Sequence, residues 1–222
     1  PTPQYSMASN HNMGDGLKIS QSLGAKIDDP PHKRSAFWSP VSITKRKDGS
    51  NGLYPHILLD RAKPGLIAVN SAGQRFVNEA CSYHDFVEAM YRSHEVVDTI
   101  PAWLICDATF VFKYGIGAIH PGTKNLKKYS DLGYIKTSNT VKGLSKILMI
   151  DESNLENTIN RSNEFASTGI DIDFGKGDLE LNRFNGDADN HPNPCLARIG
   201  TPPFVAVAVS HYIVATEHIA LE

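Results

Sequence analysis

The sequence predicts a domain of the α+β class, with helices and antiparallel hairpins in one unit. Two observations favour this class. The first is that helical segments and short β-type runs both occur; the second is that they do not alternate in the strand–helix–strand order of a parallel sheet. The chain of 222 residues is long enough to bury a hydrophobic core without a disulfide or a metal.

Four segments carry helical patterns, at residues 17–24, 82–93, 140–148 and about 151–166. The first follows Gly14-Asp15-Gly16 and ends at Gly24, a residue type that commonly caps a helix C-terminus. The second is predicted to begin at Ser82, whose hydroxyl can act as N-cap, with Asp85 three residues on as a weak capping box.

Strands are predicted at three places. In PGLIAVNSAGQRFVN (64–78), two β-type runs flank Ser71-Ala72-Gly73, which predicts a hairpin with glycine at a position of positive φ. AWLICD (102–107) predicts a buried strand, and PPFVAVAV (202–209) is a further apolar run. Residues 28–54 are rich in Pro, Lys, Gly and Ser and predict a long surface connection with one aromatic cluster, Phe37-Trp38.

Composition excludes several classes of function. A net charge of -2 with 21% charged residues gives no electrostatic attraction to nucleic acid or to an anionic membrane. No apolar run approaches the roughly eighteen residues of a membrane span, and the N-terminus lacks the layout of a signal peptide. Cys81, Cys106 and Cys195 have no CxxC spacing, which argues against a disulfide framework and a zinc site. We therefore expect a cytoplasmic location, no nucleic acid partner and no membrane span.

Several familiar motifs are missing, namely GxGxxG after a strand, the P-loop, HExxH and GxSxG. GIG at 115–117 is followed by AIHPG rather than by a helix start, so we interpret it as a turn. DIDFGKGD (171–178) resembles part of a calcium loop but lacks the downstream Glu, so we expect its carboxylates to cap a turn. The histidines lack ligand spacing, and no metal site is predicted.

Two side chains at the start of the predicted helix 82–93 are candidates for chemistry. Cys81 could be a thiolate stabilised by backbone amides; the alternative is a buried structural cysteine. Tyr83 lies in the first turn, where free amides and the helix macrodipole favour a phenol in its anionic form. Such a tyrosine can accept a proton; the alternative is that Tyr83 packs against Phe86 and Val87.

The stretch RAKPGLIAVNSAGQRFVNEACSYHDFVEAMY resembles the substrate-domain motif of the FAD-dependent fumarate reductase and 3-ketosteroid dehydrogenase superfamily, and within it the ketosteroid Δ1-dehydrogenase (3-oxosteroid 1-dehydrogenase) branch. Further matches follow in order along almost the whole chain: GDGLKISQSLGA, PAWLICD, GYIKTSNTVKGLSKIL, NLENTINRSNEFASTGIDIDFGKGD, PNPCLARI and PPFVAVAV. Each motif is modest alone, and their order makes the resemblance specific.

The resemblance implies the capping-domain fold of fumarate reductase and succinate dehydrogenase flavoproteins, a domain inserted between two halves of an FAD-binding domain. We expect residues 1–27 to link from that missing domain, 28–204 to form the substrate-binding cap, and 205–222 to lead back as a strand and tail. FAD would then be bound mainly by domains absent from this chain. The chain lacks an initiator Met and its closing Leu221-Glu222 is typical of a cloning scar, so we expect an excised piece that is inactive alone.

Residue roles follow from the same resemblance. The GDG aspartate that contacts FAD in relatives falls on Asp15, and Gly14 and Gly16 let the backbone approach the cofactor. Four residues beyond the glutamate of the RFxNE motif, fumarate reductases place an arginine that donates a proton, and Δ1-dehydrogenases place a tyrosine that removes one. Here Glu79 plus four is Tyr83, which selects dehydrogenation.

The implied substrate is a flat, apolar, carbonyl-activated molecule such as a 3-ketosteroid. Phe37, Trp38 and Tyr54 are candidate apolar walls for it, with aromatic core packing as the alternative. Asn78 and Glu79 are candidates for the substrate site as groups that fix the turn, or else they only satisfy backbone donors. The chain departs from the family pattern at Val205 and after it, where a tyrosine and a glycine-rich segment usually stand.

Two alternative functions stay open at this point. An ene-reductase of the fumarate reductase type would need Arg61 or Arg75 as its acid, and no residues match the histidine and arginines that clamp a dicarboxylate. A non-catalytic binding or assembly module is the second alternative.

Overall fold

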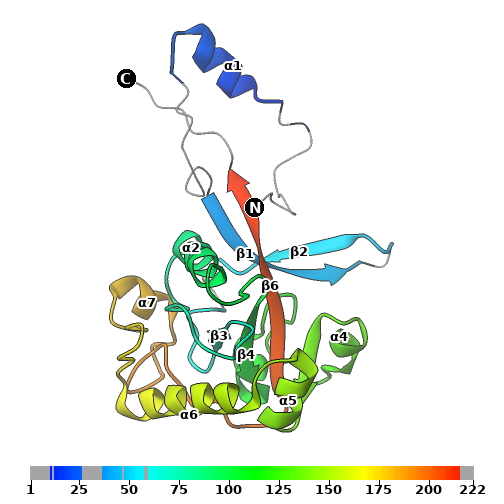
Figure 1. Cartoon of the computed structure of the whole chain (residues 1–222), viewed down its shortest axis with the longest axis vertical. Coiled ribbons are helices and arrows are strands. Elements are labelled where there is room, and N and C mark those ends of the chain that lie inside the picture. Colours follow the sequence, from blue (N-terminus) through cyan, green and yellow to red (C-terminus); the bar gives the residue numbers. More distant parts are fainter. Residues whose placement is uncertain (1–10, 12, 27–36, 47, 58–59, 216–222) are drawn as a thin grey trace.

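The computed structural model describes residues 11, 13–26, 37–46, 48–57 and 60–215. A six-stranded antiparallel sheet lies at its centre, in the order β2-β1-β6-β4-β3, with β5 also paired to β6. The strands are β1 (Phe37–Lys45), β2 (Asn51–Pro55), β3 (Ile67–Val69), β4 (Ala102–Asp107), β5 (Ile135–Ser138) and β6 (Phe204–Ala215). Figure 1 shows β6, in red, running through the middle of the molecule.

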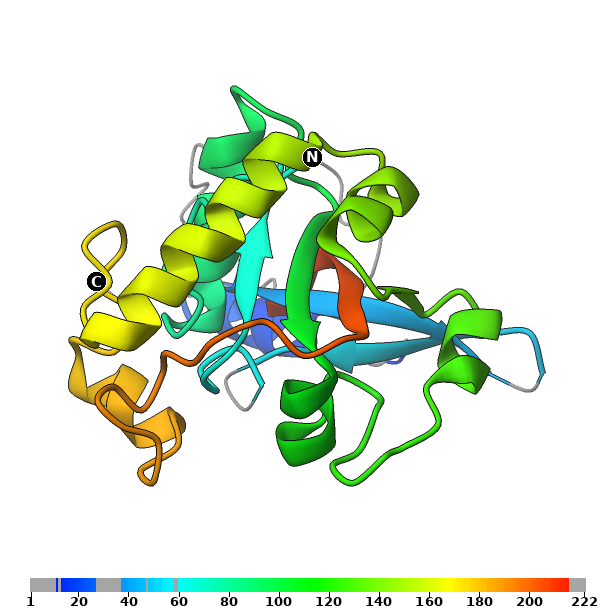
Figure 2. The ribbon, with the colours of Figure 1, turned by 90° about the horizontal axis from the view of Figure 1, so that it is seen from below.

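Helices cover both faces of the sheet, because successive residues of a strand point to opposite sides. Leu104 and Val207 face a core built with α2 (Tyr83–His94) and α3 (Ala108–Tyr114), whereas Ile105 and Ala206 face a second core built with α5 (Val141–Leu148) and α6 (Glu152–Thr168). The ribbon seen from below shows the long helix α6 beside β3 and β4 (Figure 2). The helices are α1 (Asp15–Ser22), α2 (Tyr83–His94), α3 (Ala108–Tyr114), α4 (Lys127–Asp131), α5 (Val141–Leu148), α6 (Glu152–Thr168) and α7 (Glu180–Asn185).

The four predicted helices are confirmed as α1, α2, α5 and α6, and AWLICD is confirmed as β4. The hairpin predicted over 64–78 is confirmed only in part, because its second run shrinks to one isolated bridge, from Val69 to Arg75. The turn itself is as predicted. Gly73 has φ +76°, and the Asn70 side chain accepts hydrogen bonds from the amides of Ala72 and Gln74.

The prediction of a long surface connection over 28–54 is wrong for its second half. β1 and β2 form an antiparallel hairpin there, and β1 also pairs with β6. Pro40 and the flanking lysines conceal the strand, since proline is disfavoured inside strands. Val41 and Ser42 are nevertheless buried, which makes β1 part of the packed sheet. Residues 27–36 lie outside the described part of the chain.

β1 and β6 bring the two ends of the sheet region together. The register pairs Phe37 with Ala215, so the chain enters the sheet and leaves it side by side. The predicted boundary at 204/205 falls at the first residues of β6, which pairs with β1, β4 and β5 and is therefore continuous with the sheet. The domain assignment itself stays a prediction.

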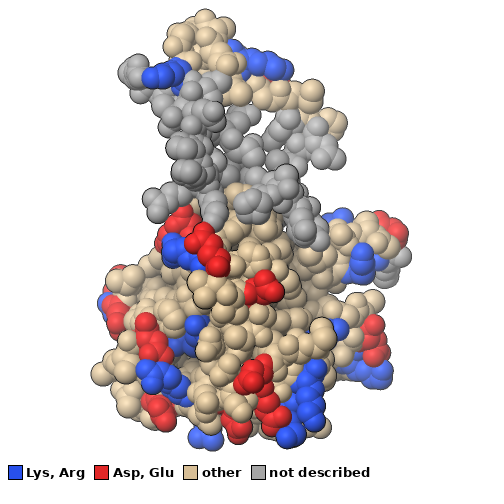
Figure 3. Space-filling view, in the orientation of Figure 1, with Lys and Arg blue, Asp and Glu red and all other residues tan. Residues whose placement is uncertain are grey.

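α1 differs from the other long helices because none of its residues is buried. It lies apart from the body in Figure 1, and its Ile19 is 61% exposed. On the face drawn in Figure 3, positive and negative side chains are interspersed and neither sign forms a continuous field. Within the described residues, no helix is both long and apolar enough to cross a membrane.

Candidate active site

Tyr83 is the first residue of α2, as the sequence predicts, and its side chain is half-buried. The helix begins here because of the residue before it. Ser82 has an extended backbone, and its hydroxyl accepts a hydrogen bond from the Asp85 amide at 3.1 Å. The same hydroxyl donates to the Asp85 carboxylate at 2.8 Å. This reciprocal cap fixes the point at which Tyr83 leaves the loop.

A second tyrosine, Tyr212 on β6, lies near Tyr83. Tyr212 is paired in register with Ser39 of β1 and its side chain is buried. Burial raises the pKa of Tyr212, the Ser39 hydroxyl opposes that rise, and the nearby Tyr83 adds to it. Sequence reasoning missed Tyr212, because it lies in the segment that departs from the family pattern.

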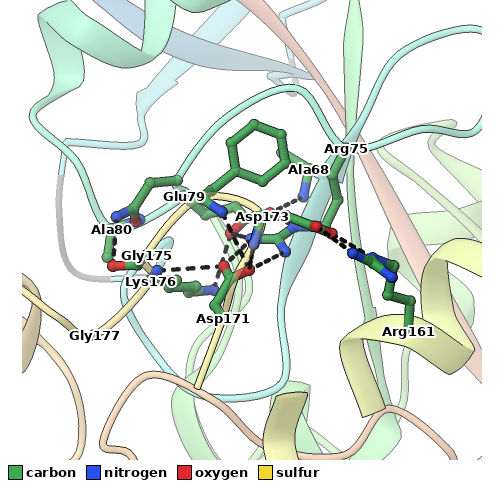
Figure 4. Close-up of polar contacts among 12 residues, drawn as sticks. Ala68, Arg75, Glu79, Ala80, Arg161, Asp171, Asp173, Gly175, Lys176 and Gly177 are labelled. Carbon is green, nitrogen blue, oxygen red and sulfur yellow. Dashed lines mark hydrogen bonds and ion pairs between the residues drawn. The ribbon is translucent and has the colours of Figure 1, made fainter. Parts of the chain in front are cut away.

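A group of four buried charged residues includes a residue of the turn that leads into α2. Its members are Arg75, Glu79, Asp171 and Lys176 (Figure 4). Arg75 donates two hydrogen bonds to Glu79, at 2.8 and 2.9 Å, and two to Asp171, at 3.1 and 2.7 Å. Lys176 donates to the Leu66 carbonyl at 2.7 Å and lies 3.5 Å from Glu79. Two cations thus balance two carboxylates, which is what burial of charge requires.

The ionisation of Glu79 is set by this group. Burial alone would raise the pKa of Glu79, but the charges of Arg75 and Lys176 outweigh it and lower the pKa to about 2. Burial also lowers the pKa of Lys176, against the opposing effect of Glu79. Glu79 also accepts the Ala68 amide at 3.0 Å. Its oxygens are therefore engaged by Arg75, Lys176 and the Ala68 amide, and they connect β3 to the turn before α2.

Asn78 is engaged in the same way. Its amide group donates to the Gly175 carbonyl at 3.2 Å and to the Asn182 side chain at 3.0 Å, and its oxygen accepts the Ala80 amide at 2.9 Å. These contacts favour the interpretation in which Asn78 and Glu79 fix the turn rather than touch a substrate.

The aromatic candidates divide into two cases. The side chain of Phe37 lies outside what the structure describes. Trp38 is 5% exposed and packs edge-on against Tyr91 and His211, with ring centroids 5.4 Å apart in each pair. This burial favours core packing for Trp38 over a role as the wall of a substrate cavity.

The Gly14-Asp15-Gly16 motif forms the start of α1. Gly14 has φ +69°, a conformation in which a side chain is strained, so glycine is needed at this N-cap. The Asp15 side chain is 76% exposed and lies 3.4 Å from Lys18. The start of α1 is therefore exposed, and its contact with FAD stays a prediction.

Cys81 is not an activated nucleophile. Burial raises its pKa to about 11, against the opposing effect of the nearby Arg61. The thiol donates weakly to the Ser82 carbonyl at 3.4 Å. The structural alternative for Cys81, which is half-buried, is therefore the better one; Cys106 and Cys195 are buried, and all three cysteines are free.

The two arginines considered as proton donors are both fully engaged. Arg61 is buried and donates to backbone carbonyls, and Arg75 is held between Glu79 and Asp171. Burial alone would lower the pKa of Arg75, but its two carboxylate partners raise it. Neither arginine is placed to deliver a proton to a bound molecule.

Two further motif interpretations, the turns at DIDFGKGD and at GIG, agree with the structure. Asp171 caps the turn of DIDFGKGD by accepting the amides of Asp173 and Phe174. GIG is a turn, with Gly115 and Gly117 both at positive φ. Within the described part of the chain, no cluster of three or more possible metal ligands occurs.

The fold matches part of the solved structure of a ketosteroid dehydrogenase. The crystal structure of 3-ketosteroid Δ1-dehydrogenase from Sterolibacterium denitrificans in complex with 1,4-androstadiene-3,17-dione superposes with a TM-score of 0.80 at 34% identity, over 95% of this chain and 37% of that one. The chain is also 36% identical to the 4-oxocyclohex-2-ene-1-carboxylate 5-dehydrogenase of Sinomonas cyclohexanicum, over 88% of its length and 33% of the relative. It is 30% identical to the 3-oxosteroid 1-dehydrogenase of Mycobacterium tuberculosis, over 91% and 35%.

The family is established by a match that covers almost the whole chain. Residues 1–216 match the FAD binding domain family, and the chain belongs to it. The predicted resemblance to the fumarate reductase and 3-ketosteroid dehydrogenase superfamily is thereby confirmed. The chain spans about a third of the length of the relatives it matches.

Proposed function

We propose that this chain is the substrate-binding cap of an FAD-dependent dehydrogenase that removes two hydrogens from adjacent carbons of a carbonyl-activated substrate. The observation that supports this most strongly is the placement of Tyr83. It stands four residues after Glu79, at the first position of a capped helix, on a turn braced from behind by buried charges.

In this proposal Tyr83 is the proton acceptor. FAD would supply the acceptor for the hydride of the neighbouring carbon, with Gly14, Asp15 and Gly16 as the candidate contacts from this chain. A carbonyl beside the reacting carbons acidifies the C–H bond, so that a phenolate can remove the proton. The Tyr83 oxygen then carries that proton as a neutral phenol until it is lost to solvent. The cap excludes water from the reacting groups.

The arrangement of the chain ends supports the role of a cap. Because Phe37 pairs with Ala215, the sheet is entered and left at one place, as expected of a unit inserted into another domain. The exposed apolar side chains of Ile19 on α1 and of Leu23 at its C-cap, together with the glycine-flanked start of the helix, suit contact with the FAD-binding part of the same polypeptide.

Substrate class follows from the relatives as part of the proposal. Relatives at 36% and 30% identity are named for action on an oxocyclohexene carboxylate and on a 3-oxosteroid. Both names describe a ring carbonyl, so we propose a cyclic ketone, steroid-like in shape. The fumarate reductase alternative is weaker, because Arg61 and Arg75 are committed to other contacts.

The experiment is an anaerobic assay of the full-length protein with a 3-ketosteroid, with 4-oxocyclohexanecarboxylate and with fumarate. We expect one or both cyclic ketones to reduce bound FAD, and we expect fumarate not to oxidise the reduced protein. Turnover of fumarate without reaction of either ketone would contradict the proposal.

A further inference from the structure

Arg61 is a buried cation whose guanidinium, among the described residues, donates to backbone oxygens, interacts with the Cys81 side chain and lies over one aromatic ring. Its side chain is 0% exposed. Nε donates to the His56 carbonyl at 2.6 Å and Nη1 to the Glu79 carbonyl at 2.6 Å. Nη2 donates to the carbonyls of Ile57 and Cys81, the latter at 3.2 Å. Within the part of the chain that the structure describes, no carboxylate forms an ion pair with this guanidinium.

Burial of a guanidinium group in the core is unfavourable in free energy compared with burial of an apolar side chain. Removing a cation from water is unfavourable unless partners replace the water, and an apolar side chain of similar volume would avoid the cost. The guanidinium can, however, hold several acceptors at once, because its N–H donors lie in a fixed planar fork. The carbonyls it holds belong to two segments far apart in sequence, 56–57 and 79–81.

The second of these segments is the turn that leads into α2. The Glu79 and Cys81 carbonyls lie just before the N-cap Ser82. On the other side of Tyr83, the ring of Phe86 lies over the guanidinium, 4.6 Å from its central carbon. Arg61 therefore contacts the chain both before and after Tyr83.

The first segment is fixed to the sheet. The His56 ring is hydrogen-bonded at both nitrogens. Nδ1 lies 2.6 Å from the Asp60 carboxylate, and Nε2 lies 2.7 Å from the hydroxyl of Ser42 on β1. The Ser42 hydroxyl also meets the Tyr134 hydroxyl at 2.7 Å. A serine, a histidine and an aspartate in this order can form a nucleophilic triad, but Ser42 and His56 are buried and already partnered, so the chain of contacts is a brace.

We propose that Arg61 is a positioning residue for Tyr83, which it connects to the sheet by holding the turn before α2 and the ring of Phe86. The inference rests on the proposed function, in which Tyr83 is the proton acceptor. A shift of Tyr83 by about an ångström is enough to slow a proton transfer by roughly a hundredfold. Substrate binding does not depend on such a shift to the same degree.

The test uses the full-length holoenzyme with a 3-ketosteroid or cyclic ketone that it oxidises, and compares R61K, R61M, Y83F and the double variant R61K/Y83F. Lysine keeps the charge but lacks the planar fork of donors, so it cannot hold the carbonyls of both segments in the same geometry. We expect kcat to fall in the order wild type, R61K, R61M, with R61K lower by roughly ten- to a hundredfold. KM and FAD content should stay near the wild-type values, and the substrate deuterium isotope effect on kcat should rise.

The double variant separates positioning from general destabilisation. If Arg61 acts through Tyr83, R61K has little further effect on kcat once the Tyr83 hydroxyl is gone. An equal fold-loss from R61K in the wild-type and the Y83F backgrounds would overturn the inference. R61K is sufficient for this cycle if R61M does not fold.

Asp107→Asn is the matched control for a buried polar residue away from α2. Asp107 caps α3 and holds the amides of Gly200 and Thr201, both at 2.9 Å. We expect D107N to lower the melting temperature and leave kcat unchanged. Loss of kcat in D107N equal to that in R61K would show that stability alone controls turnover, and would overturn the inference. Near-normal kcat in Y83F would instead refute the proposed function.

Discussion

Arg75 and Glu79 face each other through two parallel hydrogen bonds, Nε to Oε1 at 2.8 Å and Nη2 to Oε2 at 2.9 Å, with both side chains buried. Arginine and carboxylate match in this two-pronged geometry, which adds direction to the attraction. The pair joins the end of the Asn70–Gln74 turn to the turn before α2. The pair thus stabilises the turn that precedes Tyr83.

Glu79→Gln tests that support through its pH dependence. The folded pKa of Glu79, about 2, is below its ordinary value of 4.5. A depressed carboxylate pKa stabilises the fold above the ordinary pKa, and this stability is lost as pH falls from about 4.5 towards 2. The shift corresponds to roughly 3 kcal/mol.

We therefore expect the free energy of unfolding of wild type to exceed that of E79Q most near neutral pH, with the difference shrinking as pH falls below about 4.5. Urea unfolding at several pH values measures it. Glu180→Gln is the control, since that side chain is 87% exposed. A wild-type advantage that stays constant down to the acid limit would be inconsistent with the low pKa.

Ser82→Ala removes the cap that starts α2. Loss of an N-cap hydroxyl costs about 1 kcal/mol, and here it also frees the first turn that holds Tyr83. We expect S82A to lower turnover of the full-length enzyme several-fold. Thr140→Ala removes the equivalent cap of α5, where Thr140 accepts the Gly143 amide at 2.9 Å, and should cost similar stability without loss of turnover. Equal turnover in both variants would show that the cap does not matter for chemistry.

Much of the fold could be predicted because local rules apply at its helices. Ser82, Thr140 and Asp151 each cap a helix as their residue types favour. The β1–β2 hairpin could not be predicted, because Pro40 interrupts a pattern that is apolar only where partners from β6 arrive. Strand identity there depends on tertiary pairing, which no local window contains.

The sequence predicts one catalytic candidate of the site. Tyr83 is proposed from the family resemblance, through its position four residues after Glu79; its predicted place in the first turn of a helix is confirmed, and its catalytic role stays a prediction. The buried contacts of Arg61, His56 and Lys176 could not be predicted, since their partners lie on remote segments and are often backbone atoms. A lone arginine or histidine in a sequence gives no sign of a carbonyl partner on a distant segment.

Gly117→Ala tests the hydrogen-bond network that joins Ser42 to His56 and Tyr134. Gly117 has φ +54°, and an added Cβ would lie 2.1 Å from the Tyr134 hydroxyl and 3.2 Å from Ser42 Oγ. We expect G117A to cost roughly 2 to 4 kcal/mol, from backbone strain plus this overlap.

Gly133→Ala is the control for strain alone, because Gly133 has φ +73° and an added Cβ meets nothing within 4 Å. Thermal or urea unfolding of both variants gives the comparison. A loss no larger in G117A than in G133A would mean that the hydroxyl network tolerates the extra methyl group.

Cys81 provides a test of burial near the site. Because burial raises its pKa to about 11, we expect alkylation by iodoacetamide at pH 8 to be much slower than that of a free thiol, and to accelerate only in strong alkali. Peptide mass spectrometry after timed labelling measures the rate, with urea-unfolded protein as the reference. Fast labelling of Cys81 in the folded protein near neutral pH would revive the thiolate interpretation.

The most direct test of the central claim is the rate of flavin reduction in a single anaerobic turnover, followed by flavin absorbance in full-length wild type and Y83F. With Tyr83 as the proton acceptor, reduction by a cyclic ketone substrate should be at least about a hundredfold slower in Y83F, with FAD content unchanged. Equal reduction rates in the two proteins would contradict the account and return Tyr83 to a packing role.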